Sequence, residues 1–408
     1  MKVNRIYQIQ INQQHLIYNI INDLCFKSKN LYNYANYILR QEFINNNKYI
    51  KYNKLTYNIK HDDPFKALGS NSAQQLLRLL DKNWKSFFIA IKDYTKNPDK
   101  YLNRPKLPKY KKKNGKCIFS LCNNQFRIEN NYLYFCWKPL KPFNDTFKIN
   151  IPKDSKLIQL RFIPRNNIYV MELVYEKDIP DTNDNKEPTR ICGIDLGVNN
   201  FATLTNNVGA KPIIINGRII KSINQFYNKK LAYYKSILKK TNNKDWSNKL
   251  DRLTIKRNNK IKYYMHCASK IIIEYCIKNN IDTIIIGKNN EWKQNSDLYK
   301  TANQIFVQIP YENFIKMMQY KAEDIGIKVI LTNESYTSGT SFLDGELPIK
   351  ENYNKKRRIV RGLFKSNKGK LINSDVNGSL QIIKKVIPKA FTSYGIEGLD
   401  LTPLVMNL

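Results

Sequence analysis

The sequence predicts a multidomain α+β protein: an N-terminal domain of antiparallel strands interrupted by helices, then a C-terminal α/β domain. Three observations lead to this prediction. Residues 2–11 alternate polar and apolar side chains, as a half-buried strand does. Helical patterns follow, and short strand-like runs resume only near Cys117. Beyond a polar, proline-bearing linker at 178–189, strands and helices alternate to the end of the chain.

The helices of the first half are predicted from apolar side chains at helical spacing. From Gln13 to about Asn47 these side chains are Leu16, Ile20, Leu24 and Leu31. A second helix is expected from Ser72, its predicted N-cap, to about Tyr94. Its apolar face carries Leu76, Leu77, Leu80, Trp84, Phe87, Phe88 and Ile91.

The first strand and the later strands are expected to form one β domain around these helices. Between Cys117 and about Tyr175, short alternating runs are separated by Gly, Pro and Asn turns, which is typical of an antiparallel sheet or small barrel. We therefore expect a β-barrel from residues 1–12 and 101–180, with a helical insertion over 13–100.

A basic connector, "NRPKLPKYKKKNGK" over residues 103–116, joins the helices to the later strands. Its two prolines favour an extended backbone, and its lysines suit contact with phosphate groups. Lys111, Lys112 and Lys113 are candidate phosphate contacts by composition and placement. The alternative is a solvated linker.

The order of elements in the second half, residues 186–408, predicts an RNase H-like fold. Three strands lie in "RICGIDLG", "NFATLTN" and "KPIIIN", and a helical stretch over 218–279 has a polar break at 241–244. The expected remainder is a strand at 282–287, a helix at 310–325, a strand at 328–333 and a closing helix from about Val376. In such folds, functional side chains gather at the carboxyl ends of the parallel strands.

The charge of the chain points to a polyanionic partner. Lys and Arg number 69 against 33 Asp and Glu, a net charge of +36 at pH 7. Such an excess repels itself unless a polyanion neutralises it, so nucleic acid is the expected partner. The alternative is a merely soluble basic protein. Runs such as "YKKK" and "KIKYY" suit base stacking beside phosphate neutralisation, although most aromatic rings are expected in the core.

Cysteine usage and hydropathy indicate an intracellular setting. The seven cysteines contain no CxxC pair, which favours reduced thiols. The start "MKVNRIYQIQ" is polar, so no secretory leader is expected, and no apolar run reaches the ~18 residues that a membrane helix needs.

The sequence lacks the residue patterns of histidine-based catalysis and of ATP hydrolysis. The histidines, His15, His61 and His266, are isolated from one another, which argues against a histidine-based triad or metal cluster. Before Lys370 the glycines do not have P-loop spacing, and Leu371 occupies the place of the magnesium-binding Ser or Thr. ATP hydrolysis is not supported.

Two aspartates stand out. In "GIDLGVNN" an apolar strand delivers Asp195 to its end, and Gly197 opens a turn. A carboxylate there is either a metal ligand or a cap of its own turn. In "INSDVNGSLQI", Asp375 precedes a helix and is either a metal ligand or its N-cap. Gly378 and Ser379 would let that helix approach a sheet closely.

Three segments carry a family resemblance: "CGIDLGVNNFATLTNN", "FVQIPYENFIKMMQYKAEDIGIKVILTNESYTS" and "RGLFKSNKGKLINSDVNGSLQI". They resemble the OrfB/TnpB family of insertion-sequence proteins, to which Fanzor proteins and type V CRISPR effectors are related. "SAQQLLRLLDKNWKSFF" and "RPKLPKYKKK" in the first half are similar to the same family in layout.

The resemblance implies an RNA-guided DNA endonuclease associated with a transposable element. The second half would be a RuvC nuclease domain, and the first half a wedge-type barrel with a helical recognition domain. An omega-type guide RNA would pair with one strand of a double-stranded DNA target, while the protein reads a short flanking motif. The protein itself is expected to be monomeric within this ribonucleoprotein. Three carboxylates would hold two Mg²⁺ ions, or Mn²⁺, one activating water and the other stabilising the leaving oxygen.

One carboxylate of this set is missing from its expected place. Many relatives have a glutamate at the end of the strand that corresponds to 281–287, where this chain has Gly287-Lys288-Asn289. Glu291 lies beyond the strand in a polar loop and is the fallback. Glu334 directly follows the next parallel strand, about 4.8 Å away. The expected catalytic and metal-binding set is therefore Asp195, Glu334 and Asp375.

Another departure from the family concerns zinc. Many members carry a CxxC…CxxC ribbon between the second and third motifs, but residues 335–374 contain no cysteine, so no zinc is predicted. Lys355, Lys356, Arg357 and Arg358 are candidate nucleic-acid contacts. This cluster could instead be a solvated loop or, in a eukaryotic host, a nuclear import signal.

Two other functions remain open at this stage. One is a nuclease-dead relative that binds DNA through its guide and represses transcription, and the other is an RNase H-fold transposase. The expected location is the cytoplasm or nucleoid of a bacterial host, or the nucleus if the host is a eukaryote.

Overall fold

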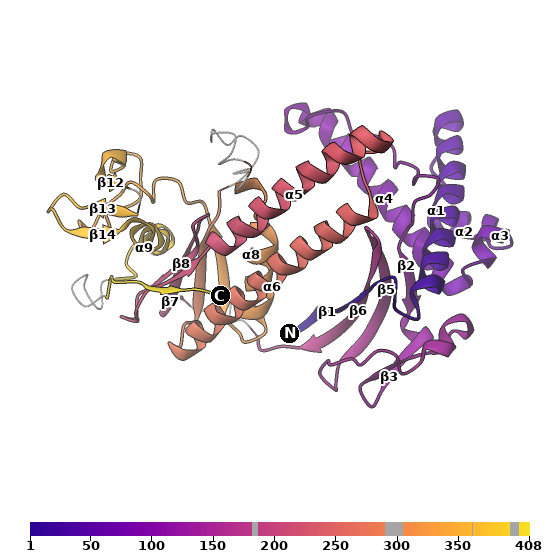
Figure 1. Cartoon of the computed structure of the whole chain (residues 1–408), viewed down its shortest axis with the longest axis horizontal. Coiled ribbons are helices and arrows are strands. Elements are labelled where there is room, and N and C mark those ends of the chain that lie inside the picture. The colour runs from indigo at the N-terminus through magenta and orange to yellow at the C-terminus, as the bar shows by residue number, and fades with distance from the viewer. Residues whose placement is uncertain (182–186, 290–303, 305, 361, 392–399) are drawn as a thin grey trace. The chain divides into compact units, whose positions relative to one another are not determined.

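The computed structural model describes residues 1–181, 187–289, 304, 306–360, 362–391 and 400–408 (Figure 1). The chain divides into two compact units. The N-terminal unit is Lys2–Asp178, and the C-terminal unit is Ile179–Leu408 together with Met1. Both contain helices and sheets, so the chain is a multidomain α+β protein.

The N-terminal unit is built on a four-stranded antiparallel sheet in the order β1-β6-β5-β2. Its strands are β1 (Lys2–Ile11), β2 (Phe119–Cys122), β5 (Lys156–Arg165) and β6 (Ile168–Asp178). The first strand has the predicted bounds. β1 and β2 are the two edges, so the hydrogen bonds of this sheet do not close it into the expected barrel.

Two of the expected strands form a separate hairpin instead, which helps to explain the open sheet. β3 (Phe126–Glu129) pairs with β4 (Tyr132–Phe135). Asn130 and Asn131 join them with left-handed φ angles of 49° and 64°, as a tight hairpin turn requires. The run near Lys148 contributes a single bridge, to Tyr132.

The helices of this unit are α1 (Tyr18–Asn46), α2 (Tyr52–Ile59), α3 (Asp63–Lys66) and α4 (Ser70–Lys96). Short 3₁₀ turns follow at Pro98–Lys100, Asn123–Gln125 and Lys138–Phe143. The prediction that Ser72 caps α4 is wrong: Gly69 is the N-cap, and Ser72 is buried in the first turn. Fully buried Trp84 joins α4 to α1 by donating a hydrogen bond to Asn36 Oδ1 at 3.0 Å.

The C-terminal unit contains a six-stranded mixed sheet in the order β11-β10-β7-β8-β9-β15. Its strands are β7 (Ile191–Leu196), β8 (Asn200–Asn206), β9 (Ile213–Asn216), β10 (Thr283–Gly287), β11 (Lys328–Thr332) and β15 (Leu404–Met406). β7, β8 and β9 are antiparallel, whereas β10 lies parallel to both β7 and β11. β15 adds to the far edge, parallel to β9.

Helices cover both faces of this sheet (Figure 1). They are α5 (Arg218–Asn242), α6 (Asn248–Lys278), α8 (Tyr311–Glu323) and α9 (Ser374–Val386). Side chains of α6 and α8 share one core cluster with Cys192, Ile194 and Leu196, and α9 shares another with Ile191. None of the helices among the described residues could cross a membrane.

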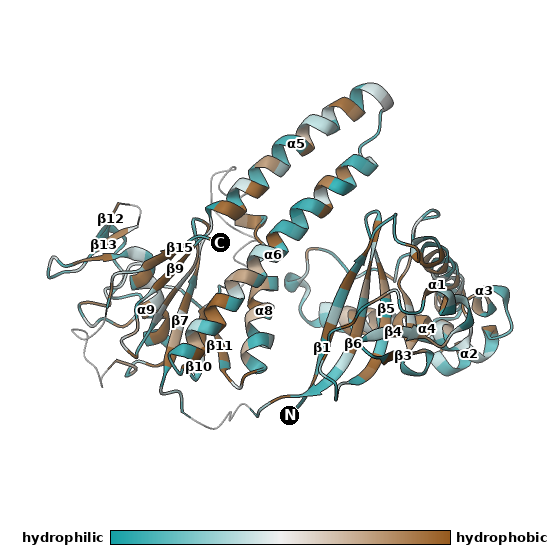
Figure 2. Cartoon of the chain, turned by 60° about the horizontal axis from the view of Figure 1, so that its bottom comes forward, coloured by the Kyte–Doolittle hydropathy of each residue, from teal (hydrophilic) through white to brown (hydrophobic). Residues whose placement is uncertain are grey.

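The predicted polar break divides the long helical stretch into two helices that run side by side and extend beyond the sheet (Figure 2). α5 ends at Asn242, and its C-cap Asn243 takes a left-handed φ of 48°. α6 then begins after Ser247, whose side chain accepts a hydrogen bond from Leu250 N.

The segment 335–374 is held together by turns, a small sheet and an ion pair. β12 (Arg358–Val360), β13 (Leu363–Lys365) and β14 (Leu371–Asn373) pair antiparallel, after a 3₁₀ turn at Lys355–Arg357. Arg357 donates from both terminal nitrogens to Glu346, at 2.5 and 2.8 Å. The Arg357 and Glu346 side chains are only 13% and 16% exposed, so this pair lies inside the segment.

Removing the Arg357 charge is expected to destabilise the protein. Arg357→Met leaves the Glu346 carboxylate shielded from water without its counter-charge, which we expect to lower the free energy of unfolding by about 2 kcal/mol. Urea unfolding measures this change. The matched control is Lys355→Met on the exposed side of the same turn, where the change should stay within about 0.5 kcal/mol. Equal effects of the two substitutions would contradict the structural importance of the pair.

Candidate active site

Asp195 lies near the carboxyl end of β7, on the face that α9 covers. Side chains alternate along a strand, so Asp195 shares a face with Ile191 and Gly193. A Cβ at Gly193 would lie 2.6 Å from Ser379 O, and a Cβ at Gly378 would lie 2.9 Å from Asp195 Oδ2. These two glycines therefore let α9 press against β7 and over the Asp195 carboxylate. The predicted close packing of this helix is confirmed.

The same helix brings Asp375 to the sheet. The N-cap of α9 is Asn373, whose side chain accepts hydrogen bonds from the backbone N–H groups of Asp375 and Val376. The alternative that Asp375 caps the helix is therefore wrong, and its carboxylate is available for other contacts. Asn200 Nδ2 donates to Asp375 Oδ2 at 2.6 Å.

A tight turn presents Asn200 to Asp375. The turn after β7 starts at Gly197, where a Cβ would lie 2.6 Å from Asn200 O. Among the described residues, this turn donates no hydrogen bond to the Asp195 carboxylate, and Gly197 N donates to Phe201 O instead, so Asp195 does not act as a turn cap. Tyr311, at the start of α8, supports the turn by donating to Gly197 O at 2.7 Å.

The Glu334 side chain reaches the end of β10. Ile194, Ile286 and Leu331 lie side by side across the three parallel strands, and Glu334 follows just beyond β11. A Cβ at Gly287 would lie only 2.9 Å from Glu334 Oε2 and 3.3 Å from Glu334 Cβ. The Glu334 side chain therefore crosses from its own strand end over the end of β10.

Asn289 fixes the Glu334 side chain by two reciprocal hydrogen bonds. Asn289 Nδ2 donates to Glu334 Oε1, and Glu334 N donates to Asn289 Oδ1, both at 3.0 Å. Lys288 N bonds to Thr332 O at 2.8 Å, which extends the pairing of β10 and β11 to this point. The Asn289 side chain, just after β10, therefore orients the Glu334 carboxylate, which follows the neighbouring strand β11.

Asp195 lies close enough to Glu334 and Asp375 for their charges to disfavour its own. Burial raises the pKa of Asp195 well above its usual range, and the charges of Glu334 and Asp375 raise it further, while Arg358 opposes them. Burial also raises the pKa of Glu334 to about 7, against the opposing charge of Lys385. A cation placed among these groups would relieve the repulsion.

The donor set suits a hard cation. The carboxylates offer only oxygen ligands, which Mg²⁺ and Mn²⁺ prefer. Within the described residues, no group of three or more His, Cys, Asp or Glu side chains is arranged to hold one ion. This does not conflict with Mg²⁺, since that ion is usually bound by one or two carboxylates together with water and substrate phosphate.

The structure places the other predicted site residues as follows. Glu291 lies outside the described residues. Lys111, Lys112 and Lys113 belong to the N-terminal unit and are exposed. Lys355 and Lys356 are also exposed, whereas the Arg357 guanidinium is bound by Glu346, so the structure does not support it as a phosphate contact.

Arg358 is the member of this cluster with recorded contacts at the candidate active site. Its Nη2 lies 3.5 Å from Asp375 Oδ1 and donates to Ser374 Oγ at 3.1 Å. Its side chain is 40% exposed.

Sequence reasoning did not single out Asn200, Asn289 or Lys385. A weak signal existed for the two asparagines, since each lies at a strand end in the carboxylate-bearing region, in "GVNN" and "GKNN". Lys385 is one lysine among many. Its Nζ is placed near Glu334 by hydrogen bonds to Ser335 O and Oγ at 2.6 and 2.9 Å.

Comparisons with known proteins give matches to two family models and to one viral protein. The OrfB_IS605 family model, described as a probable transposase, matches residues 172–293, which include Asp195. The model of the Cas12f1-like TNB domain matches residues 311–382, which include Glu334 and Asp375. The TnpB-like protein ORF457 of Acidianus two-tailed virus is 24% identical over 396 residues, covering 88% of this chain and 82% of the viral protein. By these matches the chain resembles the OrfB/TnpB family.

The chain also shows weak likeness to solved structures. A cryo-EM structure of a Cas12f1–sgRNA–target DNA complex is 17% identical with a TM-score of 0.38, covering 93% of this chain and 98% of that chain. The mini RNA-guided endonuclease CRISPR-Cas_phi3 is 9% identical with a TM-score of 0.47, covering 94% and 92%.

Proposed function

We propose that this protein is an RNA-guided DNA endonuclease and that its C-terminal unit is a RuvC nuclease domain. The observation that carries the proposal is the convergence of Asp195, Glu334 and Asp375 at one edge of the sheet. Three antiparallel strands followed by two parallel ones, in the order β11-β10-β7-β8-β9, support an RNase H-like fold. The N-terminal unit would then contain the wedge-type sheet and the helical recognition insertion.

The three carboxylates would hold Mg²⁺, or Mn²⁺, in this mechanism. Two bound ions would activate the attacking water and stabilise the leaving oxygen. The protein's part is to keep the oxygen ligands in place. Asn289 holds Glu334, Asn200 holds Asp375, and Arg358 reduces the repulsion on Asp195. The exposed part of the Arg358 side chain would also be able to meet a phosphate oxygen of the bound strand.

The partners follow from the family and from the charge. We propose a guide RNA and a double-stranded DNA target, because a protein with a net charge of +36 requires a polyanion to neutralise it. A monomeric protein within the ribonucleoprotein is the simplest assembly. Its location would be the cytoplasm or nucleoid in a bacterial host and the nucleus in a eukaryotic one. We also propose that segment 335–374 folds without zinc, which metal analysis of the purified protein tests.

A transposase remains the second candidate, because the family model that matches residues 172–293 is described as a probable transposase. The same fold and the same carboxylates would serve strand transfer. The two candidates differ in what must be bound: a guided nuclease requires an RNA of defined length, whereas a transposase requires the ends of its element.

Plasmid cleavage by the purified ribonucleoprotein tests the proposed function. The wild type with its co-purified RNA should cut a matched plasmid in Mg²⁺ and should stop cutting in EDTA. Asp195→Asn and Asp375→Asn, which keep the side-chain size but remove the charge, should bind the target without cutting it. Guided binding by the wild type without cutting would favour the nuclease-dead repressor. Strand joining without a bound RNA would favour the transposase.

Loss of the Asn289 amide should weaken cutting without removing a carboxylate. Asn289→Ala deletes both hydrogen bonds to Glu334, and residues that orient metal ligands typically contribute tenfold or more to activity. We therefore expect about tenfold slower cleavage and a higher Mn²⁺ concentration for half-maximal rate. Asn333→Ala is the control, since the Asn333 side chain bonds to Ser335 N instead. Equal rates for both variants would show that Asn289 does not position Glu334.

A further inference from the structure

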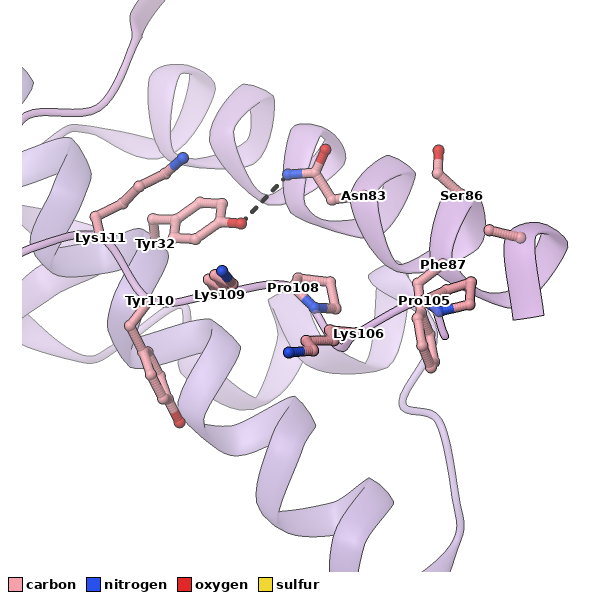
Figure 3. Close-up of a pocket in the computed structure, with 11 residues that line it drawn as sticks. Tyr32, Asn83, Ser86, Phe87, Pro105, Lys106, Pro108, Lys109, Tyr110 and Lys111 are labelled. Atoms are coloured by element: carbon pink, nitrogen blue, oxygen red, sulfur yellow. Dashed lines mark hydrogen bonds between the residues drawn. The ribbon is translucent and has the colours of Figure 1, made fainter. Parts of the chain in front are cut away.

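The N-terminal unit contains a groove that the proposed nuclease chemistry does not use. It has a volume of about 420 Å³ and lies between α4, Tyr32 of α1 and the basic connector. Figure 3 shows the connector passing along α4, from which Asn83, Ser86 and Phe87 project. On the connector side, the groove is lined by Lys106, Lys109 and Lys111.

The connector that forms one wall is fixed by α1. Four α1 side chains on one helical face bond to its backbone: Lys29 to Lys113 O, Asn33 to Lys111 N and O, and both Asn36 and Arg40 to Pro108 O, at 2.8–3.0 Å. The alternative of a solvated linker is therefore wrong. Because these bonds engage backbone atoms, the lysine side chains of the connector stay available, and binding would need little further ordering of the wall.

The lining of the groove combines cations with flat rings. Its three lysines are accompanied by no acidic side chain among the lining residues, all of which are described. Tyr32, Phe87 and Tyr110 supply aromatic surface, and Lys111 Nζ lies 5.0 Å from the centre of the Tyr32 ring. Asn83 donates to Tyr32 OH at 3.3 Å, which leaves its carbonyl oxygen as an acceptor. Tyr32 is buried, but lysine cations beside half-buried Phe87 and exposed Tyr110 suit a phosphate joined to a planar base.

We propose that this groove binds one nucleotide of a single-stranded nucleic-acid segment, with the base on Phe87 and the phosphate on Lys106 and Lys109. A duplex fits less well, because its bases are paired and stacked inside the helix and do not present a free face to the groove. The size of the groove is that of a site for one small planar group. The inference rests on the proposed function, because it requires that the chain binds nucleic acid.

Binding of short oligonucleotides to the full-length chain tests the inference. The probes are 12-nucleotide RNA and DNA strands of one sequence, each carrying 2-aminopurine, and the blunt DNA duplex of that sequence. We expect tighter binding of a single strand than of the duplex, with quenched 2-aminopurine. Phe87→Leu keeps an apolar side chain beside Trp84 but removes the ring, and should weaken binding about tenfold and restore fluorescence. Comparing the two strands shows whether RNA or DNA is the ligand.

Two matched double variants distinguish phosphate binding in the groove from nonspecific attraction to the basic surface. Lys106→Ala with Lys109→Ala should lower the slope of log K against log salt by about 1.4, for two phosphate contacts to a single strand. Lys82→Ala with Lys92→Ala removes the same charge from exposed positions of α4 outside the lining and should leave the slope unchanged.

The outcomes separate this inference from the proposed function. If the wild type cuts plasmid but the Phe87 and Lys106/Lys109 variants bind single strands like the Lys82/Lys92 control, the groove is not a nucleotide site and the nuclease proposal stands. Tighter binding of the duplex than of either strand would also overturn the inference. If the wild type neither binds an oligonucleotide nor cuts, both proposals fail.

Discussion

Glu334→Ala is expected to abolish target cleavage while target binding survives. The substitution removes the carboxylate that lies over Gly287 and would leave only Asp195 and Asp375 of the three proposed metal ligands. Removal of one preorganised charge at a reacting phosphate typically costs a hundredfold or more, so we expect a rate at least about 100-fold lower. Single-turnover cleavage of a labelled duplex measures the rate, and gel shift of the same duplex measures binding.

Two comparisons make this result specific. Glu334→Gln keeps the hydrogen-bonding shape beside Asn289 but removes the charge, so it should be nearly as slow as Glu334→Ala. Glu291→Ala, at the fallback position, should cut like the wild type. A fast Glu334→Ala together with a slow Glu291→Ala would show that the third ligand comes from the loop after β10 and not from the end of β11.

Sequence patterns were sufficient for the parts of the site that depend on local structure. Asp195 was predictable as a carboxylate at the end of an apolar strand, and Glu334 as the residue just beyond the next parallel strand. In both cases strand order alone determines which edge of the sheet the side chain reaches. The catalytic roles of these residues stay predictions until they are tested.

Contacts between distant segments were not predictable in this way. Asn200 and Asp375 are 175 residues apart, and Asn289 and Glu334 are 45 apart. Each pair depends on register and on side-chain direction in three dimensions. The open sheet of the N-terminal unit was missed for the same reason, because alternation alone does not identify which strands pair, and β3 and β4 pair with each other instead of joining the larger sheet.

Gly287→Ala is expected to impair cutting although it removes no functional group. The added Cβ would lie 2.9 Å from Glu334 Oε2 and 2.6 Å from Ile382 Cδ1, which is closer than non-bonded atoms normally approach. The Glu334 side chain would have to move away from the end of β10 and would lose its geometry with Asn289. A displacement of about 1 Å at a catalytic group can reduce the rate about 100-fold, so we expect a loss of that order in single-turnover cleavage.

A double variant separates displacement of Glu334 from a general packing defect. Ile382→Val deletes Cδ1 and so clears the Ile382 contact. By itself it should cost about 1 kcal/mol of stability and leave cutting unchanged. If the loss arises at Glu334, Gly287→Ala with Ile382→Val should recover thermal stability but still cut slowly. Recovery of both thermal stability and cutting would mean that the clash with Ile382 of α9 accounts for the whole loss of activity. Glu334 would then not require the open space above Gly287.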